Sequence, residues 1–167
     1  SGPRKNVHNL ITSFIEEFHD DKDTGLVLKL FTRTNSPLDK EATSVMVRKI
    51  TNHYPNKKCK IHLLHGGMTD AELNTLYTHP SIKGYVTLTH GEGFGLPIFE
   101  AAYNGLPVIA PEWSGYTDFT SFKPTNRSKK EKSHIIGLKH NISPVQEEAV
   151  WNGVIERGTN WCFVDLP

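Results

Sequence analysis

Apolar residues recur three and four positions apart in three stretches of the chain, a spacing that predicts helices with one buried face. Each stretch opens with a helix-starting residue. Asn6 is a suitable N-cap, Ser36 precedes a proline at the first helical position, and Thr69 forms a capping box with Glu72. The predicted helices begin at residues 7, 37 and 70, and they end near residues 18, 52 and 79.

Short apolar runs alternate with these helices and predict strands. The runs cover residues 25–31, 61–64, 84–89, 106–110 and 135–142. The run GLVLKLF is nearly continuous, which is typical of a strand buried on both faces of a parallel sheet. Two further helices are predicted, one over residues 96–104 with Gly105 as its stop and one after Ser143-Pro144. Residues 120–134 are polar and without period, so we expect a mobile loop there.

This alternation of strand and helix predicts βαβ units and the α/β class. The expected architecture is a Rossmann-like, doubly wound parallel sheet, with ligands bound at the carboxyl ends of its strands. A chain of 167 residues with 37% apolar residues fits one core, so we expect residues 1–167 to form a single domain.

Charge and cysteine content exclude several classes of function. The 19 basic and 18 acidic side chains give a net charge of +1, which predicts no nucleic-acid partner. Cys59 and Cys162 have neither zinc-site nor disulfide-scaffold spacing, and the nine histidines form no HExxH motif, so no metal is expected. No apolar run approaches the ~20 residues of a membrane span. The expected location is the cytoplasm.

The densest chemical signal is the run GEGFGLPIFE over residues 91–100. Its glycines allow backbone N–H groups to approach a ligand, and the start of the following helix attracts an anion such as a diphosphate. Glu92 follows a predicted buried strand, where a carboxylate can accept hydrogen bonds from sugar or ribose hydroxyls. Glu100 can do the same, or it can simply complement the helix dipole.

Two further side chains have both a functional and a structural interpretation. His90 adjoins Glu92 at a strand end, so it can touch a substrate or serve the fold alone. Lys29 interrupts an apolar strand, so it can bind a donor phosphate or a carboxylate, or extend to solvent at the strand end.

Glu92 and Glu100 stand in an E-x7-E relation, and the string EGFGLPIFEAAYNGLPVIAP resembles the signature of retaining GT-B glycosyltransferases of family 4. Two other segments, RKNVHNLITSF and HGGMTDAELNTLY, are similar to parts of the family that precede this signature. The similarity is greatest to a phage and bacterial type with RKN and WSGYTDF. The resemblance covers most of the chain and keeps the order of its segments.

This resemblance implies that the chain is the C-terminal, donor-binding half of a GT-B glycosyltransferase. Glu100 would hold the ribose, Glu92 would orient the transferred sugar and is the catalytic candidate, and the amides of Gly93 to Leu96 would contact sugar and phosphate. Arg4 or Lys5 would meet the diphosphate. The implied donor-binding residues are Arg4, Lys5, Lys29, Gly66, Gly67, Met68, His90, Gly93, Phe94, Gly95, Leu96, Glu100, Ser114 and Gly115.

The activity implied is transfer of a hexose from a UDP- or GDP-sugar with retention of configuration, without metal or cofactor. The acceptor would bind an N-terminal domain of the same or another polypeptide, because this chain matches only the donor half and lacks that half's opening strand and closing helices. Two alternatives are a sugar-nucleotide-binding module or pseudoenzyme without transfer, and a different nucleotide-binding α/β protein.

Overall fold

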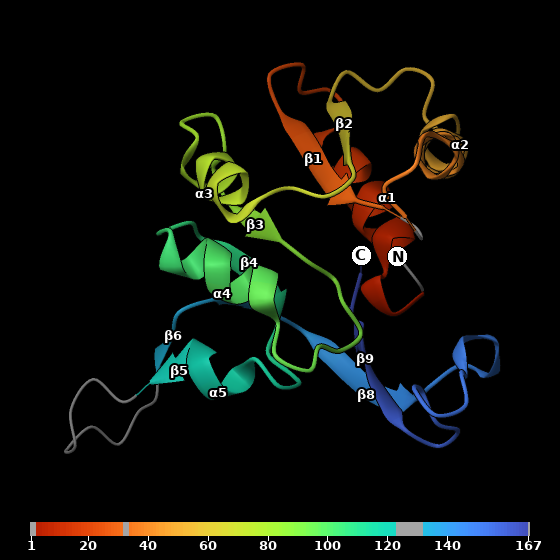
Figure 1. Ribbon diagram of the computed structural model, residues 1–167, viewed down its shortest axis with the longest axis vertical. Helices are drawn as coiled ribbons and strands as arrows, with labels where there is room; N and C mark the ends of the chain where they lie inside the picture. The colour runs from red at the N-terminus through yellow and green to blue at the C-terminus, as the bar shows by residue number, and fades with distance from the viewer. Residues whose placement is uncertain (1–2, 32–33, 123–131, 167) are drawn as a thin grey trace. The chain divides into compact units, whose positions relative to one another are not determined.

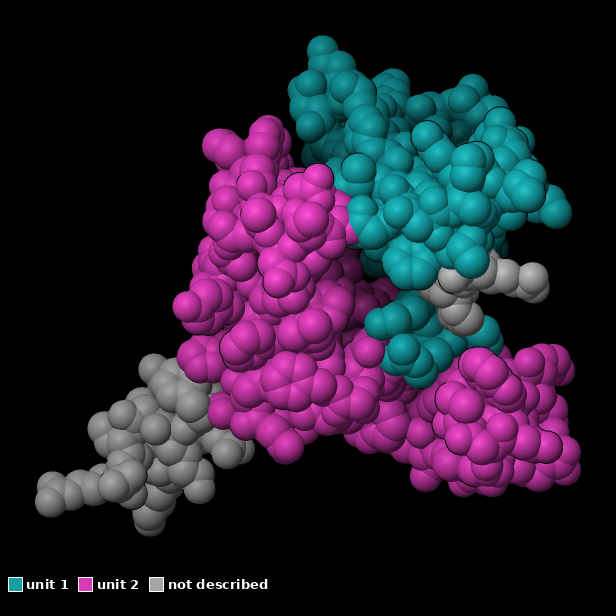
Figure 2. Space-filling model, in the orientation of Figure 1, with its two compact units in different colours: residues 1–67 teal, residues 68–167 magenta. Residues whose placement is uncertain are grey.

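The computed structural model describes residues 3–31, 34–122 and 132–166, and the chain is of mixed α/β class with parallel strands (Figure 1). It divides into two compact units, Ser1–Gly67 and Met68–Pro167, coloured separately in Figure 2.

The first unit contains two helices and one parallel strand pair. Its elements are η1 (Pro3–Lys5), α1 (Val7–Phe18), β1 (Gly25–Leu30), α2 (Pro37–Thr51) and β2 (Lys60–His65). Gly25 lies opposite Lys60 and Leu30 opposite His65 along the parallel ladder. The two helices and two strands that the sequence predicts here are confirmed within a residue or two.

The helix starts of this unit differ in their chemistry. Ser36 caps α2 as predicted, since its Oγ accepts a hydrogen bond from the amide of Asp39 at 3.2 Å. Asn6 is the N-cap residue of α1 as predicted, but its side chain makes no capping hydrogen bond. A capping side chain needs an extended backbone, whereas the turn Pro3–Lys5 leaves Asn6 left-handed with φ 51°.

Burial alternates along β1, which corrects the prediction of a strand buried on both faces. Leu26 and Leu28 are 7% and 4% exposed, whereas Val27 between them is 38% exposed. Such alternation is typical of a strand with only one covered face. A continuous apolar run does not distinguish the two situations, because Val favours strands whether or not it is buried.

The second unit is built on a three-stranded parallel sheet in the order β3-β4-β7. Its first elements are α3 (Asp70–Thr78), β3 (Tyr85–Val86), α4 (Leu96–Tyr103), β4 (Val108–Pro111), α5 (Thr117–Thr120) and β7 (Ile136–Leu138). The buried core of α4, β4 and their neighbours consists of Ile98, Ala101, Val108, Ala110, Tyr116 and Ile135. The strand predicted over residues 84–89 is shorter than expected, because β3 contains only Tyr85 and Val86. The amide of Thr87 nevertheless donates to the carbonyl of Ile109 at 3.0 Å.

Two antiparallel pairs complete this unit. One joins β5 (Ser121–Phe122) to β6 (Lys132–Ser133), so the described ends of the predicted loop 120–134 are paired, and residues 123–131 lie outside the described residues. The other joins β8 (His140–Pro144) to β9 (Asn160–Val164). The single strand predicted over residues 135–142 is thus two strands, β7 and β8, with different partners.

The helix predicted after Ser143-Pro144 was wrong. Pro144 ends β8, and only a 3-10 turn, η2 (Glu147–Ala149), follows. The chain then reverses at a turn closed by pairing of Trp151 with Ile155, where Gly153 has φ 80°. A left-handed glycine breaks a helix but suits a tight turn.

The α/β class is confirmed, and a Rossmann-like, doubly wound sheet remains a prediction. Parallel pairing occurs within each unit, as one two-stranded and one three-stranded ladder among the described residues. Within that part of the chain, no helix combines the length and the apolar character needed to cross a membrane.

Candidate functional site

The loop between β3 and α4, residues 87–95 and called the Glu92 loop below, carries the glycine-rich motif, and two of its glycines are closely packed. A Cβ at Gly91 would lie 3.0 Å from the Trp113 ring. Gly95, the residue before α4, has φ 81°, and a Cβ there would lie 2.9 Å from the Tyr116 Cβ. Tyr116 is fully buried and its hydroxyl donates to the Pro111 carbonyl, so it is a rigid support for the loop.

Ser114 and Gly115 hold the backbone of Glu92. The Ser114 Oγ accepts from the amide of Glu92 at 3.0 Å and donates to its carbonyl at 2.7 Å. The amide of Gly115 donates to the same carbonyl at 3.1 Å. Ser114 has φ 91°, an unfavourable conformation for a residue with a Cβ. A Cβ at Gly115 would fall 1.7 Å from the Gly93 carbonyl oxygen, so only glycine fits there.

The backbone amides of Gly93, Phe94, Gly95 and Leu96 find no hydrogen-bond acceptor within the part of the chain that the structure describes. They stand at the N-terminus of α4, where the helix dipole favours negative charge. Gly93 has open space in the direction of a side chain. Such an arrangement of donors is suited to an anion.

The carboxylate of Glu92 is half-buried and oriented by a neighbouring hydroxyl. Its Oε1 lies 3.1 Å from the Oγ1 of Thr89, which also lies 3.2 Å from the Gly91 carbonyl. Thr89 is 1% exposed, so this hydroxyl is fixed by the fold. The negative charge of Glu92 also contributes to raising the pKa of Tyr85 on β3, after the larger effect of burial.

Glu100 lies beyond the first turn of α4, in contact with α3. The hydroxyl of Tyr77 donates to its Oε2 at 3.3 Å. Because α4 has no acidic residue in its first turn and the dipole effect falls off after that turn, complementing the dipole explains Glu100 poorly. Sequence reasoning missed Tyr77 and Thr89. Their only signal was position, since Tyr77 is the second-last residue of α3 and Thr89 stands three residues before Glu92.

His90 is 7% exposed and is held by β9. Its Nδ1 donates to the carbonyl of Cys162 at 2.6 Å, and the amide of Cys162 donates to the His90 carbonyl at 3.0 Å. The ring stacks on Trp161 with centroids 5.0 Å apart and lies 4.6 Å from the Phe163 ring. Through these contacts His90 joins the Glu92 loop to β9, which is a structural role. Contact of His90 with a substrate remains a prediction.

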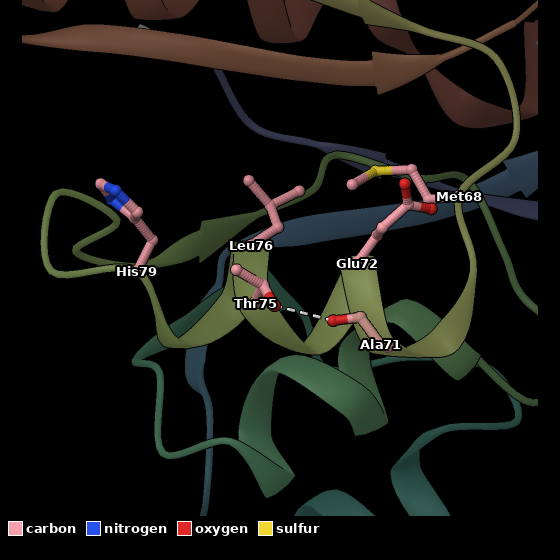
Figure 3. A pocket seen from close by; sticks show the side chains of 6 residues that line it. All are labelled: Met68, Ala71, Glu72, Thr75, Leu76 and His79. Carbon is pink, nitrogen blue, oxygen red and sulfur yellow. Dashed lines mark hydrogen bonds between the residues drawn. The ribbon is translucent and has the colours of Figure 1, made fainter.

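One face of α3 lines a groove of about 410 Å³ that begins at Met68 (Figure 3). Its lining residues are Met68, Ala71, Glu72, Thr75, Leu76 and His79. The capping box predicted at the start of α3 is confirmed. The amide of Thr69 donates to the Glu72 carboxylate at 2.7 Å, and the amide of Glu72 donates to the Thr69 hydroxyl at 3.3 Å. The groove is open and lined mainly by apolar atoms, and the Glu72 carboxylate in its lining is engaged by Thr69.

The remaining predicted donor-binding residues belong to the first unit, where Arg4 and Lys5 form the turn before α1. Lys29 donates from Nζ to the Gly66 carbonyl and lies 5.9 Å from the Phe31 ring centroid. Gly66 has φ 99°, and the amide of Gly67 donates to the Asn35 side chain at 3.3 Å. Lys29 therefore has a backbone carbonyl as its described partner, in place of the carboxylate considered from the sequence.

The second unit brings together Glu92, the amides of Gly93 to Leu96, Ser114 and Gly115. The hydrogen bonds of Ser114 to Glu92 join the two segments, which are 22 residues apart in the sequence. Among the residues that the structure describes, no group of three or more His, Cys, Asp or Glu side chains is arranged to hold a metal ion.

Comparison with known proteins finds distant glycosyltransferase relatives. The chain is 27% identical over 161 residues to each of two Escherichia coli proteins described as serotype-specific mannosyltransferase WbdA. The alignment covers 89% of this chain but only 18% and 17% of those proteins, so the chain spans less than a fifth of their length. No family model matches the chain. The similarity supports a relationship to glycosyltransferases at this coarse level.

Proposed function

We propose that this chain is the donor-binding part of a GT-B glycosyltransferase that transfers a hexose from a nucleotide-diphospho-sugar with retention of configuration. The observation that supports this most is the Glu92 loop. It combines a carboxylate fixed by Thr89, a row of amides without acceptors among the described residues, and a backbone held by Ser114. A sugar diphosphate offers the complementary groups, hydroxyls for the carboxylate and an anion for the amides.

Each carboxylate takes a different part of the donor in this proposal. Glu92 orients hydroxyls of the transferred sugar, and Glu100 accepts hydrogen bonds from the ribose. Met68 and the α3 groove receive the base, because the groove of about 410 Å³ is open and mostly apolar. The roles of Arg4, Lys5, Lys29, Gly66 and Gly67 rest on the family resemblance.

In the proposed reaction the protein supplies position and charge. Retention is achieved when the leaving diphosphate accepts the proton of the attacking acceptor hydroxyl on the same face of the sugar. The amides of the loop stabilise the charge that develops on the diphosphate, as preorganised donors do in other transferases. No metal takes part, and the acceptor binds a separate N-terminal domain of the same or another polypeptide.

The sugar proposed first is mannose, because both relatives are described as mannosyltransferases. The test is calorimetric titration of the chain with UDP, GDP and their hexose conjugates, including GDP-mannose. We expect one nucleotide to bind preferentially. Glu100→Ala should weaken that binding about tenfold to a hundredfold, the effect of losing a charged hydrogen-bond acceptor.

The matched control is Glu148→Ala, because Glu148 is an exposed glutamate of η2 in the same unit. It should leave the affinity unchanged. Unchanged affinity in Glu100→Ala refutes the ribose role, and no binding of any nucleotide by the unaltered chain refutes the proposed function. Glu92→Ala should chiefly lower transfer in the polypeptide that contains this chain. Nucleotide binding without transfer by that polypeptide supports the alternative of a binding module.

A further inference from the structure

Tyr77 connects two helices at the carboxylate assigned to the ribose. It lies on α3, and its hydroxyl donates to the Oε2 of Glu100 on α4 at 3.3 Å. The Tyr77 ring is partly buried and packs against the core cluster that contains Ile98 and Ala101. The hydroxyl is therefore carried on a rigid support.

Tyr77 is a donor at any pH near neutrality. Burial and, secondly, the charge of Glu100 raise its pKa to about 12. A protonated phenol has one hydrogen to donate, and the carboxylate can only accept it. The direction of this hydrogen bond is therefore fixed.

The two oxygens of the Glu100 carboxylate differ in their contacts. Oε2 is engaged by Tyr77, whereas Oε1 makes no hydrogen bond to any residue that the structure describes. A distance of 3.3 Å is long for an O–H···O bond, and such bonds often shorten when a ligand arrives. A carboxylate with one oxygen bonded to Tyr77 can accept a hydrogen bond from a ligand hydroxyl at its other oxygen.

We infer that Tyr77 is a positioning residue for the ribose of the donor, because its hydroxyl fixes the Glu100 carboxylate with Oε1 directed to the ribose hydroxyls. This inference rests on the proposed function. Tyr77 itself touches Glu100 and acts through it.

A purely structural role for Tyr77 predicts a different outcome. In that case the packing of the ring against the core matters and the bond to Glu100 does not. Loss of the hydroxyl then leaves the affinity for every nucleotide unchanged, or changes all of these affinities equally. Tyr77→Phe separates the two roles, because phenylalanine keeps the ring and removes the hydroxyl. Tyr103→Phe is the matched control, since Tyr103 lies on the neighbouring helix α4 and is 82% exposed.

The experiment compares each variant's affinity for GDP and UDP with its affinity for their 2′,3′-dideoxy analogues. Tyr77→Phe should weaken binding of the ribonucleotide about fivefold to tenfold. Binding of the dideoxy analogue should change less than about twofold, because it has no hydroxyl for Glu100 to receive. Tyr103→Phe should change neither affinity.

A second variant protects the conclusion against a folding defect. Glu100→Ala removes the acceptor of the Tyr77 hydroxyl, and in that background the further change Tyr77→Phe should lose most of its effect. Equal weakening of both ligands, or no weakening of either, overturns the inference while the proposed function stands. If the unaltered chain binds no nucleotide, the proposed function fails and the inference fails with it.

Discussion

The hydroxyl of Ser114 lies between the amide and the carbonyl of Glu92, 3.0 Å from the nitrogen and 2.7 Å from the oxygen. These residues are 22 positions apart in the sequence, on either side of α4 and β4. The Ser114 side chain thus binds both backbone polar groups of Glu92, the residue whose carboxylate is the catalytic candidate.

Removal of the hydroxyl should destabilise the fold. Ser114→Ala loses both hydrogen bonds to Glu92, and we expect the free energy of unfolding to fall by about 1 to 3 kcal/mol. Ser114→Gly loses the same bonds but relieves the backbone at φ 91°, a conformation that costs a residue with a Cβ about 1 to 2 kcal/mol. In urea titrations, Ser114→Gly should therefore be at least as stable as Ser114→Ala. A less stable glycine variant would contradict the assigned strain.

Substitution by alanine should strongly lower the free energy of unfolding at Gly115 and leave it nearly unchanged at Gly93. A Cβ at Gly115 meets the Gly93 carbonyl at 1.7 Å, so Gly115→Ala must displace the Glu92 loop and should cost about 3 kcal/mol or more in thermal or urea unfolding. A Cβ at Gly93 meets nothing within 4 Å, so Gly93→Ala should leave stability within about 0.5 kcal/mol. If a donor diphosphate binds there, Gly93→Ala should still lower its affinity. Equal stability losses in the two variants would count against the described loop.

His90 should contribute to stability through its hydrogen bond as well as its ring. His90→Phe keeps an aromatic ring beside Trp161 and Phe163 but removes the donor to the buried carbonyl of Cys162. We expect a loss of about 1 to 3 kcal/mol in urea unfolding. His90→Asn can place an amide N–H near the same carbonyl, and it loses the ring instead. Wild-type stability in His90→Phe would show that the contact with Cys162 contributes nothing.

The stability of the chain should fall in alkaline solution because of Tyr77. Burial and the charge of Glu100 raise its pKa from the ordinary tyrosine value of 10.0 to about 12, so the folded chain binds more protons than the unfolded chain between these pH values. The free energy of unfolding therefore falls as pH rises from about 10 towards 12, and the loss is absent below 10. Urea titrations at pH 8 and pH 11 should show Tyr77→Phe losing up to about 1 kcal/mol less than the wild type over that interval. An identical loss in both would refute the shifted pKa.

The features that the sequence predicted well depend on neighbours along the chain. Thr69 and Glu72 cap α3 because the two residues satisfy each other's backbone amides within one turn. The cap of α2 at Ser36 is local in the same way. The glycine motif predicted a turn before α4, and Gly95 at φ 81° provides it.

The features that the sequence did not predict depend on distant partners. The run over residues 135–142 is two strands because Ile136 pairs with Ile109 while Asn141 pairs with Phe163, and periodicity does not name a partner. The contact between Tyr77 and Glu100 spans 23 residues and is invisible to any local pattern. The same holds for His90, whose neighbour Cys162 is 72 residues away.

The contacts of Ser114 also bear on how fast a ligand can associate. Because the backbone of the Glu92 loop is already fixed by these hydrogen bonds, its amides need no rearrangement before they meet an anion. Association should then follow a single second-order phase whose rate rises linearly with ligand concentration. A loop that had to order itself on contact would instead show a rate that levels off.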